Sequence, residues 1–294
     1  MDDPVALPIF QRLQPLSAGI PAVSDNRPAA LAKIARAVRR RDAQMIHDAG
    51  QGHIGGDFSV IDILVTLYFA VLNFDPANPQ NPGRDRLILS KGHAAGALYT
   101  TFAALGLIPA AALSTFLQPE SLLNGHPAKT KLPGVEASTG PLGHGMPIAV
   151  GLSLAARLDA APWRTYVIVG DGELEEGSNW EALMTAAHYG LENLTVVVDR
   201  NHLQQGATTE ETTALAPLEE KLAAFGCDVR LADGHDYAAL LDVFARPPAG
   251  RPCCVVANTT KGYPVSFMSG NVAWHHRVPD DNELAAILNE LEEP

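Results

Sequence analysis

The segment "TYVIVGDGELEEG", residues 165–177, joins an apolar run to a cluster of acidic side chains. Its first six residues have the β-branched and aromatic composition of a buried strand, and Asp171 follows directly. A second apolar run, "LTVVVDRN" at 194–201, also ends in polar residues, the last of which is Asn201. Because ligands bind at the carboxyl ends of strands in open α/β sheets, we expect these two strand ends to contribute to one site.

Strand-like runs and helical patterns alternate along the chain. Further strands are expected at 86–90, 227–231 and 253–257. Helices are expected at 29–47, 59–72, 96–106, 147–159, 178–189, 217–225, 236–246 and 280–291. Ser59 or Asp57 is the expected cap of the second helix. This alternation predicts one α/β domain, a parallel sheet flanked by helices on both faces, over 29–294, preceded by an irregular, proline-rich arm over 1–28.

The composition excludes several classes of protein. With 21 basic and 33 acidic residues, the net charge of −12 argues against nonspecific binding to nucleic acid or to anionic membranes. We expect no signal peptide, because the N-terminus lacks a basic region followed by an apolar one. We expect no membrane span, because no apolar run approaches the roughly 20 residues that cross a bilayer. The three cysteines are odd in number and form no CxxC, which argues against a disulfide framework or a zinc site and favours a reducing cytoplasm.

Histidine follows glycine unusually often. Five of the ten histidines do so, where the 25 glycines in 294 residues predict about one by chance. Glycine lets the backbone approach a ligand closely, and histidine adds a group that moves protons near neutral pH. The excess indicates a polar site lined by several loops. The five are His53, His93, His126, His144 and His235.

Other polar residues have simpler interpretations. We expect packing or surface roles for His47 and His188, a turn for His235 and solvent exposure for His202. The run Arg39–Arg41 is typical of a solvated helix face.

Asp171 and Asn201 suit a hard metal ion. They offer a carboxylate and an amide oxygen, and Mg²⁺ takes few such ligands from protein and the rest from phosphates or water. Gly172 lets a phosphate approach the backbone, and the helix that begins near Ser178 favours an anion. An acidic loop that merely closes a turn is the alternative.

"GDG" followed by an asparagine 30 residues after its aspartate resembles the thiamine diphosphate fingerprint. Four further segments resemble motifs of the N-terminal half of transketolase, over about residues 30–290. They are "GQGHIGGDFSVIDIL", "LILSKGHAAGALY", "GHPAKTKLPGVEASTGPLGHG" and "TTKGYPVSFMSGNVAWHH". The resemblance implies a thiamine diphosphate-binding fold and ketol transfer between sugars or sugar-like acceptors. The cofactor would supply the carbon–carbon chemistry. The protein would orient the substrate, transfer protons and provide electrostatic stabilisation.

The resemblance also assigns residues to the cofactors. For Mg²⁺ it implies Asp171, Asn201 and the carbonyl oxygen of Leu203. For the diphosphate it implies Gly172, His93 and His275, and for the aminopyrimidine Gly140 and Leu142.

The resemblance assigns two more sets of residues. The resemblance implies that Glu176 and Glu181 join a carboxylate network across a subunit interface. It implies that His53, His126 and His275 face the substrate and move protons.

The catalytic glutamate of this family lies in a pyrimidine-binding domain, which the 294 residues do not contain. The resemblance therefore implies a split transketolase that is inactive alone. Its partner would carry the pyrimidine-binding and C-terminal domains, and the two chains would form a 2:2 heterotetramer by analogy with the family's two-fold dimer. Two alternatives stay open: a thiamine-dependent synthase that condenses a decarboxylated 2-oxo acid with an aldehyde, and a non-catalytic binding subunit.

Three positions depart from the family's usual residues. His144 replaces glutamine, Ile54 replaces proline, and His276 replaces glycine. We expect His144 and His276 to lie near the opening of the cofactor site. Two interpretations stay open: these histidines change which sugar fits the site, or they are substitutions that the family tolerates without a change in function.

Overall fold

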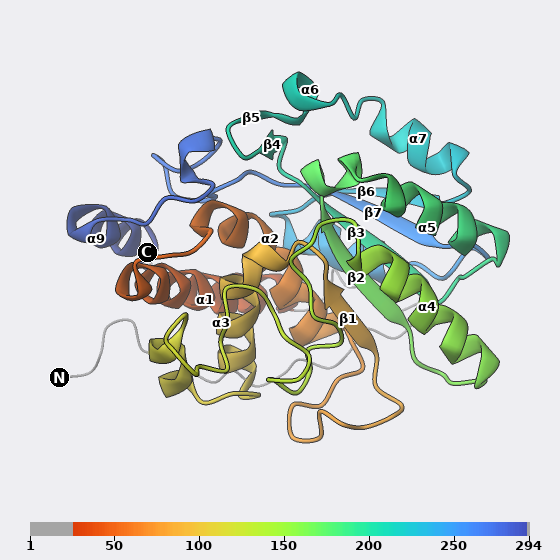
Figure 1. Cartoon of the computed structure of the whole chain (residues 1–294), viewed down its shortest axis with the longest axis horizontal. Helices are drawn as coiled ribbons and strands as arrows, with labels where there is room; N and C mark the ends of the chain where they lie inside the picture. Colours follow the sequence, from red (N-terminus) through yellow and green to blue (C-terminus); the bar gives the residue numbers. More distant parts are fainter. Residues whose placement is uncertain (1–25, 293–294) are drawn as a thin grey trace.

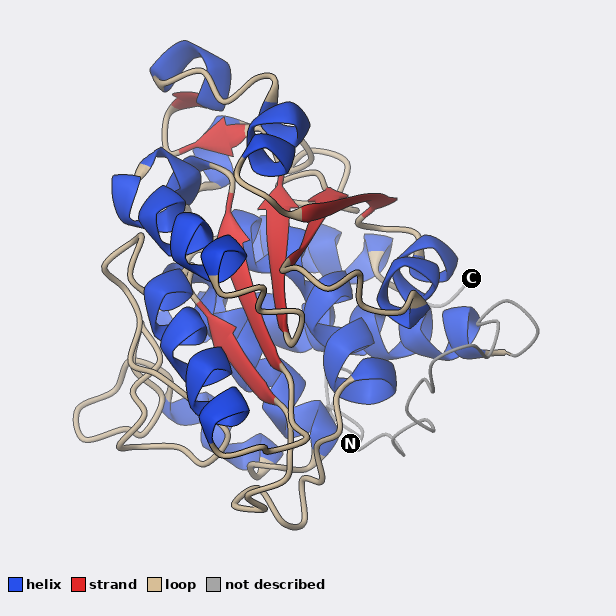
Figure 2. Ribbon diagram, turned by 90° about the vertical axis from the view of Figure 1, so that its right-hand side faces the viewer, coloured by secondary structure: helices blue, strands red, loops and turns tan. Residues whose placement is uncertain are grey.

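The central element is a five-stranded sheet in which every neighbouring pair is parallel (Figures 1 and 2). The computed structural model describes residues 26–292. The strand order is β1-β2-β3-β7-β6, with bounds Arg86–Leu89, Thr165–Gly170, Leu194–Arg200, Cys253–Asn258 and Asp228–Asp233. All five carboxyl ends therefore lie along one edge, and the predicted fold class is confirmed.

Helices cover both faces of the sheet (Figure 2). On one face lie α1 (Arg27–Ala49), α2 (Ile54–Thr66, continued by the π-helical turn Leu67–Val71), α3 (Ala95–Leu105), α8 (Tyr237–Ala245) and α9 (Asp281–Glu290). On the other lie α4 (Gly145–Leu158), α5 (Gly177–His188) and α7 (Leu218–Ala224). A small hairpin of β4 (Leu203–Gln204) and β5 (Ala207–Thr208), followed by α6 (Thr209–Thr212), has no counterpart in the sequence prediction.

Strand side chains alternate between two hydrophobic cores. In β2, Tyr166 and Ile168 pack with α1, α2 and α3, whereas Val167 and Val169 pack with α4 and α5. Successive residues of a strand point to opposite faces, so a strand that is apolar throughout needs a cover on both sides. The unbroken apolar run that follows Arg164 is explained by this double burial.

The predicted start of α2 is wrong. The helix begins five residues earlier, at Ile54, with His53 as its N-cap residue. A Cβ atom on Gly55 would lie 2.5 Å from the carbonyl oxygen of Trp274, so glycine is required here by a close approach of the backbone and not by a loop. Asp57 lies inside α2 and caps α3 instead, because its Oδ1 accepts a hydrogen bond from the backbone N–H of Ala97 at 3.1 Å.

The predicted solvated face at Arg39–Arg41 is wrong for Arg39. This side chain is 3 % exposed, and its guanidinium makes a two-pronged ion pair with Asp62 of α2 at 2.6 and 2.8 Å. The apolar stripe that contains Leu31 and Val38 is buried as expected, so the helix presents both its apolar stripe and one arginine to the interior. Charge patterning alone does not distinguish a paired buried arginine from a solvated one.

The expectation that no apolar run approaches the length of a membrane span is wrong for the helical run Ile54–Val71. By length and composition alone it could cross a membrane, with a mean hydropathy of 1.7. Every residue of this run is buried in the fold. It forms a core helix, whose apolar surface is covered by α1, α3 and α8.

The helix α1 begins at Arg27, two residues before the predicted start of the domain. The predicted arm at 1–28 lies almost wholly outside the described residues, so it stays a prediction.

We expect Arg39→Ala to lower the free energy of unfolding by about 3–5 kcal/mol, because it leaves the buried carboxylate of Asp62 without its main counter-charge. Urea unfolding followed by circular dichroism measures the change. Arg246→Ala is the matched control: it breaks an ion pair with Asp242 in which both side chains are half exposed, and should cost less than about 1 kcal/mol. Equal losses in the two variants would contradict the role given to burial.

Candidate active site

A cavity of about 250 Å³ opens at the carboxyl edge of the sheet. It brings together segments that are far apart in the sequence: the start of α2, the turns after β1, β2, β3 and β7, and the loop before α4. Of the predicted site residues it contains His53, His93, His126, Gly140, Leu142, Asp171, Gly172, Asn201, Leu203 and His275.

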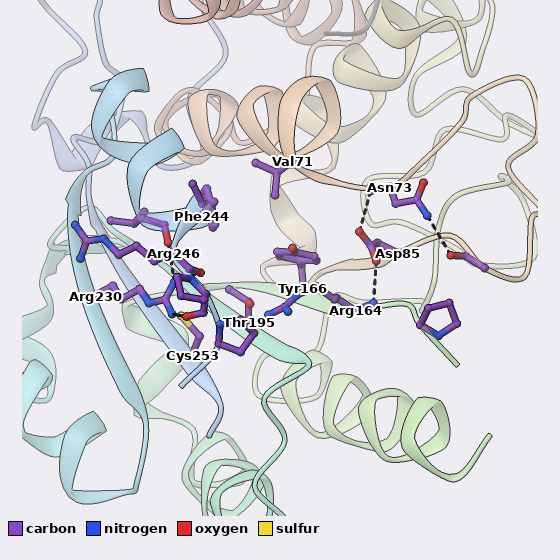
Figure 3. Close-up of a pocket in the computed structure, with 16 residues that line it drawn as sticks. Val71, Asn73, Asp85, Arg164, Tyr166, Thr195, Arg230, Phe244, Arg246 and Cys253 are labelled. Carbon is purple, nitrogen blue, oxygen red and sulfur yellow. Dashed lines mark hydrogen bonds between the residues drawn. The ribbon is translucent and has the colours of Figure 1, made fainter. Parts of the chain in front are cut away.

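A second cavity, of about 310 Å³, lies at the opposite, amino edge and is shown in Figure 3. Its most buried cation is Arg230, whose donors already bind Asp228 and the carbonyl oxygens of Val243, Arg246 and Pro247. Its thiol, Cys253, has its pKa raised to about 11 by burial, so it is not a nucleophile near neutral pH. The polar groups of this cavity hold the fold together, and the carboxyl-edge cavity is the candidate active site.

The predicted metal ligands lie side by side on the β2–β3 edge of the cavity. Asp171 Oδ2 accepts the backbone N–H of His202 at 2.6 Å, and Asn201 Oδ1 accepts that of Leu203 at 3.1 Å. Burial, and next the neighbouring Asp199, raise the pKa of Asp171 to about 6. A buried carboxylate of this kind is stabilised by a cation.

The donor set fits Mg²⁺ completed by phosphate or water. Among residues 26–292 no three His, Cys, Asp or Glu side chains gather into a metal cluster. The set instead combines one carboxylate, one amide oxygen and one backbone carbonyl, that of Leu203. Hard oxygen donors in small number suit Mg²⁺, which retains water or substrate oxygens in its other positions.

Two buried lysines that sequence reasoning missed line the same cavity. Lys91 is 1 % exposed and pairs with Asp199 at 2.5 Å. Lys261 donates to the carbonyl oxygen of Leu203 at 2.9 Å and lies 3.1 Å from His275 Nδ1. Burial, and next the charge of Lys91, lower the pKa of Lys261 to about 8. Two ammonium groups in one small cavity favour an anionic ligand.

Both lysines follow the carboxyl end of a strand, β1 and β7 respectively. The rule that drew attention to Asp171 and Asn201 would have found them, had it been applied to cations as well as to oxygen ligands.

Histidines form the other side of the cavity, with His53 at their centre. The ring centroid of His53 lies 5.4 Å from that of His93, 5.7 Å from His275 and 6.5 Å from His126. Burial, followed by the nearby His276, lowers the pKa of His53 to about 4. Burial, followed by Lys261, lowers the pKa of His275 to about 3. Both rings are therefore neutral at pH 7 and able to accept protons.

The acidic cluster that follows β2 disperses. Glu173 turns inward and accepts backbone N–H groups of Gly143 at 3.0 Å and Gly170 at 3.1 Å, which fixes the loop that carries Gly140 and Leu142. Glu176 and Glu181 instead lie exposed at the start of α5, outside the cavity. Their predicted role across a subunit interface stays a prediction.

The remaining histidines lie as follows. His276 is exposed, with its ring centroid 4.5 Å from that of His53, whereas His144 is exposed at the start of α4 and does not line the cavity. His47, His188 and His202 lie on or near the surface as expected. His235 is in a turn as expected, but its ring contacts the buried carboxylate of Asp62.

The profile of the family described as "Transketolase, thiamine diphosphate binding domain" matches residues 31–291. The chain belongs to the transketolase family. It is 46 % identical over 265 residues to one subunit of the apulose-4-phosphate transketolase of Actinobacillus succinogenes, covering 90 % of this chain and 96 % of that protein. It is 38 % identical over 260 residues to the 6-deoxy-6-sulfo-D-fructose transketolase subunit SqwG of Clostridium sp., covering 88 % and 94 %. The chain is thus one subunit of a two-chain transketolase.

Solved transketolases share the fold. The enzyme of Leishmania mexicana superposes with a TM-score of 0.83 at 31 % identity, over 89 % of this chain and 41 % of that one. The enzyme of Campylobacter jejuni gives 0.82 at 29 % identity, over 89 % and 43 %. The subunit therefore spans less than half the length of these single-chain enzymes.

We expect His53 to make the cofactor-free chain less stable in mild acid. The pKa of His53 is about 6.5 in the unfolded chain and about 4 in the folded chain. Between about pH 4 and pH 6.5 the unfolded chain therefore binds more protons than the folded chain, so the free energy of unfolding rises with pH in this range. The difference in the free energy of unfolding between pH 7 and pH 5 should therefore be smaller in His53→Gln than in the wild type. Urea titrations at both pH values measure it, with the exposed His188→Gln as control. An unchanged difference in His53→Gln would contradict the neutral, buried state of this ring.

Proposed function

We propose that the subunit binds the Mg²⁺–diphosphate half of thiamine diphosphate in the carboxyl-edge cavity and acts in ketol transfer with a second chain. The observation that carries this proposal is the pairing, in one cavity, of hard oxygen donors with two buried lysines. Asp171, Asn201 and the carbonyl of Leu203 would hold the metal ion, and Lys91, Lys261 and His93 would face the diphosphate. When bound, the cofactor supplies the carbon nucleophile that cleaves and forms the carbon–carbon bond.

The histidines suit the proton transfers. His53 and His275 are neutral, and His126, at the exposed side of the cavity, has its pKa lowered by burial. Neutral imidazoles at the cavity mouth would accept a proton from a sugar hydroxyl and return it later in the cycle. Gly140 and Leu142, fixed through Glu173, would position the aminopyrimidine.

A partner subunit completes the site in this proposal. Three relatives of similar length are named as subunits, and the solved transketolases contain more than half of their length beyond the part that matches this chain. We propose that the partner carries the pyrimidine-binding and C-terminal domains in a 2:2 assembly. Glu176 and Glu181, exposed beside the cavity, are available for the carboxylate network predicted across that interface.

The substrate we propose is a ketose with an anionic group distant from its carbonyl. The names of two relatives specify a sugar phosphate and a sulfo-sugar, and both substrates fit this description. We also propose a reducing, cytoplasmic setting, which suits three buried free cysteines.

We expect the purified chain alone to show no ketol transfer from ketose phosphate donors, and the chain that co-purifies with it from its native cells to restore activity. A coupled assay of aldose release measures both. Robust transfer by the chain alone would contradict the split enzyme, and release of CO₂ from a 2-oxo acid donor would favour a synthase instead.

We expect His276→Gly to change relative rates among donor sugars more than the affinity for thiamine diphosphate. His276 is exposed and adjoins His53, but it does not line the cavity. Rates with several donors at a saturating cofactor concentration, together with a cofactor titration, provide the comparison. Identical relative rates in variant and wild type would indicate that His276 has no role in the choice of donor sugar.

A further inference from the structure

The fifth Gly–His pair places a histidine behind the cavity wall. His235 lies in the turn between β6 and α8, and its ring bridges two elements. Nδ1 lies 2.7 Å from Asp62 Oδ2, and the backbone N–H of Thr260 donates to Nε2 at 2.8 Å. An N–H group can only donate, so Nε2 is unprotonated and the ring proton is on Nδ1, directed at Asp62.

The partners of His235 leave its ring little freedom. Asp62 is buried and also accepts two bonds from Arg39 and one from the hydroxyl of Tyr237. The ring stacks on Tyr263, with centroids 3.8 Å apart and an angle of 18° between the planes. A hydrogen-bond network centred on a buried carboxylate, with its members bonded to one another, specifies a single arrangement.

The backbone that His235 holds leads directly into the active site. Thr260 precedes Lys261, whose ammonium reaches Leu203 and His275 across the cavity. On the other side of Thr260, the hydroxyl of Thr259 donates to the buried carboxylate of Asp199. The Thr260 N–H is thus the point at which this segment is fixed from behind, between Thr259, which is anchored to Asp199, and Lys261, which lines the cavity.

We propose that His235, oriented by Asp62, is a positioning residue that fixes the backbone of Thr260 and thereby aims Lys261 at the diphosphate. The proposal rests on the proposed function for its ligand, but the positioning itself is a property of the chain without cofactor. His235 does not line the cavity and acts through Lys261.

Three variants isolate this contact. His235→Phe keeps a ring to stack on Tyr263 but lacks the acceptor. His235→Asn keeps a donor for Asp62 but is too short to reach Thr260. Tyr237→Phe is the matched control, because it removes a hydrogen bond to the same Asp62 and leaves the His235–Thr260 contact intact.

Hydrogen exchange on the full, cofactor-free chain tests the positioning. We expect the amide of Thr260 to exchange about fivefold faster in both His235 variants, which corresponds to the loss of one hydrogen bond, and at the wild-type rate in Tyr237→Phe. Wild-type exchange in both His235 variants would overturn the proposal, as would equally fast exchange in the control.

A double-mutant cycle on the affinity for thiamine diphosphate with Mg²⁺ tests the route through Lys261. We expect His235→Phe to weaken binding about fivefold in the wild-type background and not at all in a Lys261→Met background. The same loss in both backgrounds would overturn the action through Lys261. If the wild type binds no thiamine diphosphate, the proposed function fails, and hydrogen exchange still decides whether His235 positions the segment.

Discussion

The buried ion pair between Lys91 and Asp199 is the contact on which the site depends. It joins the turn after β1 to the end of β3, and Ser59 of α2 and Thr259 after β7 bind the same carboxylate. Four segments therefore meet at one point beneath the cavity. A buried pair stabilises a fold little relative to an apolar one, but breaking it is costly, so it specifies how these segments meet. The same lysine contributes positive charge to a cavity suited to an anion.

In the cavity next to this ion pair, the predicted metal ligands and the histidines come from different segments of the fold. The predicted oxygen ligands come from the ends of β2 and β3, whereas the histidines come from the start of α2, the turn after β1, the loop before α4 and the segment after β7. Close packing of backbones brings them together: a Cβ on Gly92 would lie 2.7 Å from the backbone nitrogen of Gly140, and one on Gly55 would collide with Trp274. Gly92 precedes His93, so at this pair the glycine lets two loops approach one another beside a histidine of the cavity.

The sequence predicted the sheet and most of the cavity because both follow from local patterns. Apolar runs that end in Asp171 or Asn201 reveal strand ends, and parallel pairing brings those ends to one edge. It did not predict that Arg39 is buried or that Asp57 caps α3, because each depends on a partner far along the chain. Lys91 and Lys261 were missed for another reason: they follow strand ends, but only oxygen ligands were sought there. A charged residue is expected to face solvent unless a motif indicates otherwise, and paired burial has no local signal.

Calorimetric titration of the chain with thiamine diphosphate and with thiamine, each with and without Mg²⁺, tests the central claim most directly. The proposed site assigns the diphosphate and its metal ion to this chain. It predicts that thiamine diphosphate binds in the presence of Mg²⁺ and binds at least about tenfold more weakly without Mg²⁺. It also predicts that thiamine does not bind, because both lysines and all three oxygen ligands are assigned to the diphosphate and its metal ion. Equal affinities for thiamine and thiamine diphosphate, or no effect of Mg²⁺, would contradict it.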